Sequence, residues 1–199
     1  MKKFSLLSCL LVAVAALALS ALPGCSTNTQ GDSASPVFLF GNFQLLPLDA
    51  NVSSNAAIQF DTTILTSRLK NPSATSLQFL DVQIEKYTVV WSRLDGGKTA
   101  SPQQDFPGNV IVPPNGSATL TSYPYMSADS LIRPPLDQLF PFNGGVDKET
   151  GRSEIRQAGK VTWYGHTMSG QPVVSNVATF GLIFFYSPTA GRIELKRAQ

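Results

Sequence analysis

From residue 37 onward, short runs of β-branched and aromatic residues are separated by prolines and glycines. Proline breaks helices and cannot donate to a strand ladder, while glycine permits tight turns. Few stretches keep the 3.6-residue period of an amphipathic helix, and several keep the two-residue alternation of a strand. The pattern predicts an all-β fold, an immunoglobulin-like antiparallel β-sandwich of about seven strands.

The clearest strand candidates are residues 59–70, residues 77–94 and a closing hairpin. The hairpin joins 154–168 to 172–186 through Ser169-Gly170-Gln171, and a first edge strand is expected around Phe38 and Phe43. Within 77–94, Val82 and Ile84 share one parity, whereas Tyr87, Val89 and Trp91 share the other. One extra residue flips all later side chains, so we expect a β-bulge near Glu85-Lys86.

The middle of the chain is harder to assign. Residues 110–112 and 117–122 predict a hairpin turning at Asn115-Gly116, while 98–107 is too polar and too broken by proline for a strand. The consecutive Pro134-Pro135 interrupts a nearly helical spacing of leucines. Proline is accepted in the first turn of a helix, so one short helix is expected near 135–140.

The N-terminus has the pattern of a targeting segment. Lys2 and Lys3 precede an apolar run from 4 to 22, and Leu22-Pro23-Gly24-Cys25 follows. This stretch resembles the lipobox of bacterial lipoproteins, whose leader helix is cleaved before a cysteine that is then acylated. The resemblance implies that Cys25 becomes the first residue and carries membrane lipid. An ordinary secretory signal or a retained membrane helix are the alternatives.

The resemblance also implies a location. Ser26 follows the cysteine, whereas aspartate there retains such lipoproteins in the inner membrane of Gram-negative bacteria. We therefore expect an envelope protein, in the outer membrane if the source is Gram-negative. The polar segment after Cys25 has no hydrophobic period, which is typical of a linker. The expected domains are 1–24 as signal peptide, 25–36 as acylated cysteine and linker, and 37–199 as β-sandwich.

Charge and cysteine content restrict the remaining chain. Residues 1–24 hold two lysines and no acid, which leaves 13 of the 15 basic residues against 13 acidic ones. A neutral domain has no basic surface for nucleic acid, so that partner class is not expected. The chain has two cysteines, Cys9 and Cys25. The first leaves with the leader and the second loses its thiol on acylation, so no disulfide is expected within the mature monomer.

Three segments carry a second resemblance: RLKNPS at 68–73, DVQIEKYTVVW at 81–91 and VTWYGHTMSGQPV at 161–173. They are similar to segments of a group of uncharacterised bacterial lipoproteins that have one immunoglobulin-like sandwich after the anchor. The resemblance supports the fold, but it implies no activity, cofactor or catalytic residue.

The residues give no strong sign of catalysis. His166 is the one histidine, and we interpret it as an exposed or hydrogen-bonded residue at a strand end. A pair of carboxylates acting in acid–base catalysis remains an alternative. Asp147, Glu149 and Glu154 are interleaved with basic residues, which favours a solvated loop, with calcium binding as the alternative. No catalytic residue, metal site or cofactor is therefore predicted.

Aromatic residues beside prolines are the best candidates for binding. Proline stiffens the backbone, so a ring next to it loses less entropy on contact with a partner. The alternative is that these rings fold back over one end of the sandwich as part of the core. We predict a non-catalytic envelope lipoprotein that binds an unknown envelope protein or acts structurally, with glycan or peptidoglycan recognition as the alternative. The candidate residues are Phe106, Tyr123, Tyr125, Phe140 and Phe142.

Overall fold

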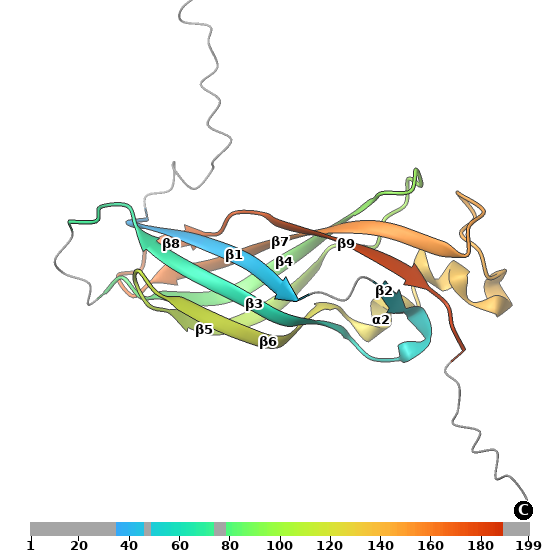
Figure 1. The fold of residues 1–199 in the computed structure, drawn as a ribbon, viewed down its shortest axis with the longest axis horizontal. Coiled ribbons are helices and arrows are strands. Elements are labelled where there is room, and N and C mark those ends of the chain that lie inside the picture. Colours follow the sequence, from blue (N-terminus) through green and yellow to red (C-terminus); the bar gives the residue numbers. More distant parts are fainter. Residues whose placement is uncertain (1–34, 46–48, 74–78, 189–199) are drawn as a thin grey trace, which may run out of the picture.

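The computed structural model describes residues 35–45, 49–73 and 79–188, and it is an elongated sandwich of two β-sheets (Figure 1). The smaller sheet has the order β1–β3–β6, and the larger has the order β2–β9–β7–β4–β5, with β8 also paired to β7. The smaller sheet contains β1 (Val37–Leu45), β3 (Ile58–Leu69) and β6 (Ser117–Met126). The larger sheet contains β2 (Asp49–Asn51), β4 (Val82–Arg93), β5 (Gln104–Val112), β7 (Glu154–Thr167), β8 (Pro172–Val174) and β9 (Ala178–Phe185).

The predicted all-β sandwich is confirmed. The strand pairs are antiparallel except β2–β9, which is parallel. Nine strands are named where about seven were expected, because the three-residue strands β2 and β8 were not anticipated. The expected leader helix falls outside the described residues. No helix within the described ranges is long and apolar enough to cross a membrane.

Short helical turns fill the connection between β6 and β7. They are α2 (Ala128–Leu131), η2 (Leu136–Leu139) and η3 (Pro141–Asn143), and a further turn, η1 (Val52–Ser54), follows β2. The short helix expected near 135–140 is confirmed as the 3₁₀ turn η2. Pro135 stands just before it, where the missing proline N–H costs no internal hydrogen bond.

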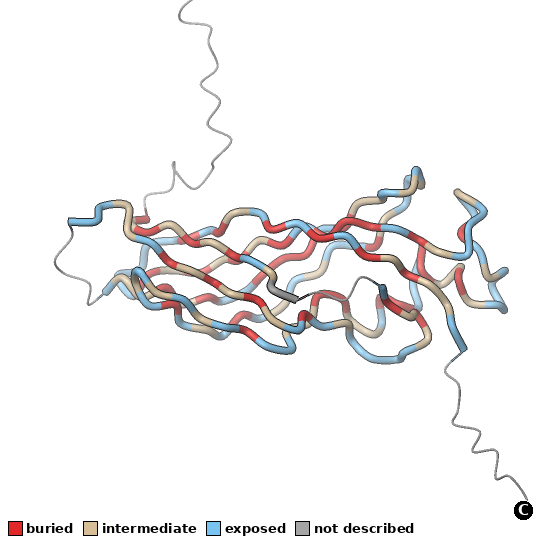
Figure 2. The backbone as a smooth tube through the Cα atoms, in the orientation of Figure 1, coloured by how far each residue is buried: buried red, intermediate tan, exposed pale blue. Residues whose placement is uncertain are grey.

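The core lies between the sheets and is rich in aromatic rings. Figure 2 shows buried residues along the strands of both sheets. Phe180 of β9 contacts Phe60 and Tyr125 of the opposite sheet at centroid distances of 5.5 and 5.2 Å, both edge to face. Trp91 and Trp163 are both buried and contribute to this layer from neighbouring strands. Edge-to-face contacts of this kind stabilise the fold by more than the burial of their apolar area alone would.

The predicted bulge in β4 is confirmed. The register shifts between Ile84 and Lys86 in the ladders to both β5 and β7. Val82 and Ile84 are buried before the shift, Glu85 and Lys86 are exposed at it, and the apolar residues Tyr87, Val89 and Trp91 are buried after it. The irregularity therefore keeps one apolar face inward along the whole strand.

The predicted hairpin at Asn115-Gly116 is wrong. The strand before the turn, β5, pairs with β4, and the strand after it, β6, pairs with β3 of the other sheet. The turn instead carries the chain between sheets, and it is fixed to β3 by hydrogen bonds from Ser67 N to Gly116 O and from Leu69 N to Asn115 Oδ1. The same turn residues serve both kinds of connection, so local sequence does not separate them.

The start of β5 was also predicted wrongly. The strand begins at Gln104 rather than at residue 110, and it contains Pro107. β5 lies at the edge of the larger sheet, where polar side chains and proline are tolerated. The closing hairpin is confirmed, although its second arm is divided into β8 and β9. Between them, Asn176 Oδ1 accepts a hydrogen bond from Gly41 N of β1 at 2.8 Å.

Candidate functional site

The five aromatic candidates do not form one surface. Tyr125 is fully buried in the core, where the centroid of its ring lies 4.6 Å from that of Phe60. For this residue the alternative prediction, that the rings fold back into the core, is correct. Phe140 and Phe142 lie together beyond the strands, with ring centroids 5.3 Å apart, and Phe142 is 80% exposed. Cys25, the predicted lipidation site, falls outside the described residues.

Phe106 and Tyr123 do come together. Both rings pack against Tyr87 of β4, at centroid distances of 5.3 and 6.0 Å. The Tyr123 hydroxyl donates to Gly108 O at 2.8 Å, and the Tyr87 hydroxyl donates to Pro124 O. Burial, reinforced by the neighbouring Tyr123, raises the pKa of Tyr87, so it remains a neutral donor. The first bond joins β6 to β5, the edge strand of the larger sheet, and the second joins β4 to β6, the edge strand of the smaller sheet.

An open cleft of about 270 Å³ lies between these two strands, lined by residues 107–109 of β5 and 121–124 of β6. Pro107, Tyr123 and Pro124 supply apolar surface. Asn109, Thr121 and Ser122 supply an amide and two hydroxyl groups, and no lining residue is charged. Such a surface can hold an uncharged ligand by ring contact together with a few hydrogen bonds.

The backbone of the cleft is strained on both sides. Asn109 has a φ of 46° and Ser122 a φ of 60°, a region that is unfavourable for residues with a Cβ atom. Strain of this kind occurs often at binding sites, where the surrounding structure holds it in place. The sequence drew attention to Phe106-Pro107 and Tyr123-Pro124, but it gave no signal for Asn109 or Ser122.

The acidic residues of the 147–154 loop do not assemble into one site. Glu149 accepts hydrogen bonds from the backbone N–H groups of Lys98 and Thr99, and Glu154 pairs with Arg156 at 2.6 Å. Each carboxylate is therefore bound to a different partner. Within the described ranges, no group of three or more His, Cys, Asp or Glu residues is placed to hold a metal ion.

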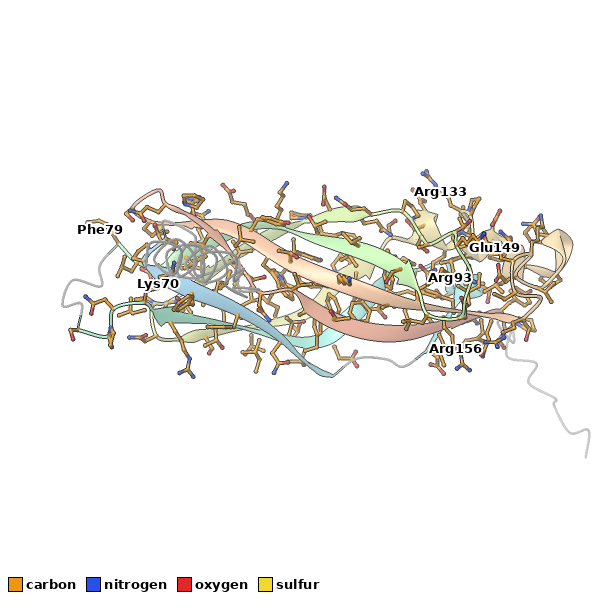
Figure 3. All side chains as sticks on the ribbon, turned by 90° about the horizontal axis from the view of Figure 1, so that it is seen from above. Lys70, Phe79, Arg93, Arg133, Glu149 and Arg156 are labelled. Carbon is orange, nitrogen blue, oxygen red and sulfur yellow. The ribbon has the colours of Figure 1, made fainter. Side chains whose placement is uncertain are left out.

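Asp147 is not solvated, contrary to the loop interpretation. It belongs to a buried cluster, here called the Arg93 clamp, in which one guanidinium binds two carboxylates; Figure 3 labels Arg93. Arg93 Nε and Nη2 donate to Asp95 at 2.8 and 3.0 Å, and Nη2 also donates to Asp147 at 2.6 Å. The side chains are 2% exposed for Arg93 and 0% for both aspartates. The clamp fixes the 147–151 turn to the end of β4.

Hydrogen bonding keeps these carboxylates ionised. Burial alone would raise the pKa of Asp95, but bonds from the Arg93 side chain and from the backbone N–H groups of Arg156 and Gly97 lower it to about 2. The pKa of Asp147 is lowered despite its burial by bonds from Arg93 and Thr150. The cluster is therefore charged at neutral pH and is structural, because its oxygens and nitrogens are occupied by one another.

His166 lies on the outer face of the larger sheet rather than at a catalytic centre. Its Nδ1 is 3.2 Å from Glu85 Oε1, and both side chains are substantially exposed. Glu85 is the residue at the bulge of β4, so the irregularity brings this carboxylate to the histidine. Within the described residues no nucleophilic side chain is recorded hydrogen-bonded to His166.

No protein-family model matches the chain, and no curated protein matches it. One solved structure that it resembles is the X-ray structure of Northeast Structural Genomics Consortium target SoR45. The two share 11% sequence identity with a TM-score of 0.35, over 82% of this chain and 95% of the other. A likeness at this level carries no argument about function.

Proposed function

We propose that this chain is a lipid-anchored, non-catalytic binding module of the bacterial cell envelope. Cys25 carries the lipid in this proposal, and the sandwich presents a binding site for an envelope partner. The support for the anchor is the lipobox-like stretch Leu22-Pro23-Gly24-Cys25 behind an apolar leader. Two or more acyl chains give stable attachment, whereas one chain holds a protein only marginally.

The β5–β6 cleft is the proposed binding site. The observation that carries this assignment is the convergence of Pro107 and Tyr123-Pro124, from different sheets, at an open cleft with strained backbone on both sides. A rigid site loses little entropy when a ligand binds, because the rings are already ordered against Tyr87.

A glycan is the second candidate ligand, and the chemistry of the cleft favours it. The lining is uncharged and combines a tyrosine ring with amide and hydroxyl groups. Sugars have apolar faces that pack on rings, and their hydroxyl groups both donate and accept hydrogen bonds. Peptidoglycan is one glycan polymer of the bacterial envelope, and purified sacculi make it available for a binding test.

The anchor is tested by metabolic labelling of the full chain with palmitate. We expect the label in the wild type and none in Cys25→Ala, because the substitution removes the acceptor thiol. The location is tested in the same cells by membrane fractionation. A wild-type chain that takes up no label and is released as a soluble protein would refute the anchoring.

The cleft is tested with a photo-crosslinking residue at Thr121, which is exposed on its rim. We expect a specific crosslinked product in intact cells. If the ligand is a glycan, we also expect the protein to become crosslinked to purified peptidoglycan sacculi. The matched control is the same residue at Thr119, exposed two positions earlier on β6 and outside the lining. Equal products from both positions, or none from either, would contradict a site in the cleft.

Binding is then tested by substitution. Thr121→Arg places a long cation in the uncharged cleft, and we expect retention on the bound partner or on sacculi to fall about tenfold or more. Thr119→Arg is the control and is expected to bind as the wild type does. Tyr125→Ala is unsuitable for this purpose, because Tyr125 is a core residue.

A further inference from the structure

The two ends of the sandwich differ in how many charged side chains they carry (Figure 3). The end that carries the Arg93 clamp is dense in ionic side chains, and Arg93, Arg133, Glu149 and Arg156 all lie there. Lys70 and Phe79 lie at the opposite end. We call this opposite end the tip and define it as the described turns 70–73, 79–81, 113–116 and 168–171. Asp81 is the one acidic residue in those turns.

Two large apolar side chains project from the tip. Phe79 is 59% exposed and Met168 is 52% exposed. Their segments lie side by side, because Ser169 N donates to Phe79 O at 3.1 Å and Met168 N donates to Asp81 O at 2.9 Å. These bonds extend the β4–β7 ladder past its last strand residues, so both residues lie at the same end of the larger sheet.

The chain reaches the sandwich at this same tip. The segment before β1 is fixed there, since Lys70 N donates to Pro36 O at 2.9 Å and β1 begins opposite Leu69. Positive charge lies at and beside the tip. Lys70 of the tip lies over the Phe38 ring at 5.1 Å, and Arg68, two residues earlier on β3, is exposed.

We infer that the tip docks on the lipid surface to which the chain is anchored, with Phe79 and Met168 inserted at the level of the headgroups. This inference rests on the anchoring proposed above. Ten peptide steps separate Cys25 from Ser35 and span at most about 36 Å. The tip is therefore held beside the membrane at an effective concentration on the order of millimolar, so a weak surface affinity is enough.

A lipid surface fits the tip better than a protein partner does. Phe79 and Met168 are exposed on neighbouring turns that carry few charges, which matches the shallow insertion of peripheral proteins into the headgroup region. Lys70 and Arg68 suit the anionic headgroups of bacterial membranes. Exposure alone does not identify the tip as the end that meets the membrane, since Phe142 at the charged end is more exposed. The tip is identified by its position, because the anchored segment joins the sandwich there.

The orientation has a consequence for the cleft. Docking of the tip keeps the charged end away from the lipid and holds β5 and β6 above the membrane, with the cleft between the two ends of the sandwich. A glycan running parallel to the membrane would then meet the cleft without approaching the lipid surface.

The test uses the acylated full-length protein, purified from membranes and reconstituted into vesicles of phosphatidylcholine and phosphatidylglycerol. Acylation of Cys25 leaves no other thiol in the chain after leader cleavage, so one introduced cysteine can be labelled with an environment-sensitive fluorophore. Gln171→Cys reports on the tip and Lys148→Cys reports on the charged end; both side chains are exposed. Quenching is measured with lipids that carry a nitroxide on the acyl chain.

We expect emission at position 171 to fall about twofold or more and emission at 148 to stay unchanged, since inserted side chains reach about 5–10 Å below the headgroup surface. Replacing Phe79 and Met168 together by serine should abolish the quenching at 171 while the protein still floats with the vesicles. Flotation without quenching at 171, or equal quenching at both positions, would overturn docking but leave the anchor intact. A protein that does not float would overturn both.

Discussion

Removing the guanidinium of the Arg93 clamp tests whether the buried cluster stabilises the charged end of the sandwich. Arg93→Met keeps the length of the side chain but leaves the Asp95 and Asp147 carboxylates, both 0% exposed, without their cation. Breaking a buried ion pair from one side costs about 3–5 kcal/mol, because an uncompensated charge stays in a poorly solvated site. We expect a loss of that size in the free energy of unfolding at pH 7.

The pH dependence follows from the direction of the pKa shifts. In the wild type the pKa of Asp95 is lowered from 3.8 to about 2. This carboxylate therefore contributes about 2 kcal/mol above pH 4, and the contribution is lost as the pH falls through about 2. In Arg93→Met the burial of Asp95 is no longer offset by the guanidinium, so its pKa rises. On acidification the free energy of unfolding therefore falls less in the variant than in the wild type. The difference in the free energy of unfolding between the two proteins narrows below about pH 4.

The assay is urea unfolding of the purified protein, followed by the fluorescence of the buried Trp91 and Trp163. Arg156→Met is the matched control, since its pair with Glu154 is partly exposed and is worth about 0–1 kcal/mol. Asp95→Asn with Asp147→Asn in the Arg93→Met background should recover much of the loss, because no buried charge remains. A loss from Arg93→Met no larger than that from Arg156→Met would refute the reasoning.

Five further substitutions at four positions test the packing, all by the same unfolding assay. In Gly159→Ala the new Cβ atom would lie 2.5 Å from Phe180 Cζ, so we expect a cost of about 1–3 kcal/mol, whereas Gly181→Ala has its nearest contact at 3.8 Å and should be nearly neutral. Tyr125→Ala should cost about 3–5 kcal/mol. Tyr125→Phe should be neutral or stabilising, because the buried hydroxyl has no hydrogen-bond partner in the described structure. Gly108→Ala would place a Cβ atom 2.6 Å from Ile84 Cγ2; we expect about 1–3 kcal/mol of destabilisation and weaker crosslinking from Thr121. A neutral result for Gly159→Ala or Gly108→Ala, or an equal cost for both Tyr125 variants, would contradict these contacts.

The sequence predicted what depends on local alternation and failed where partners are distant. The bulge at Glu85-Lys86 could be found because a change of parity within one strand has to be corrected within that strand. The turn at Asn115-Gly116 has the same local chemistry whether it joins paired strands or crosses between sheets. The choice is made by the pairing of β6 with β3, whose residues lie far away in the chain.

The candidate site shows the same division. Proline beside an aromatic ring identified Tyr123 and Tyr125 equally, yet the first lies at the cleft and the second in the core. Residues two positions apart on a strand share a face only while the backbone remains regular. The ladder between β3 and β6 loses that regularity here, because Pro124 lies opposite Gln59 but Met126 lies opposite the next residue, Ile58, which leaves Tyr125 as an extra residue. The Arg93 clamp was missed because Asp147 is 54 residues from Arg93, and no local pattern links them.

The irregularity of β4 that keeps its apolar residues inward coincides with an irregularity of β5 at the cleft. On β5 two residues, Gly108 and Asn109, lie between the partners of Ile84 and Lys86, where β4 has only Glu85. Gly108 passes so close to Ile84 that a side chain would collide, and Asn109 takes up the excess length with a positive φ. The edge of the larger sheet is therefore displaced at the point where Tyr123 reaches across to Gly108 O. A change that made β4 regular would turn Val82 and Ile84 away from the core, so the irregularity beside the cleft is required for the packing of this strand.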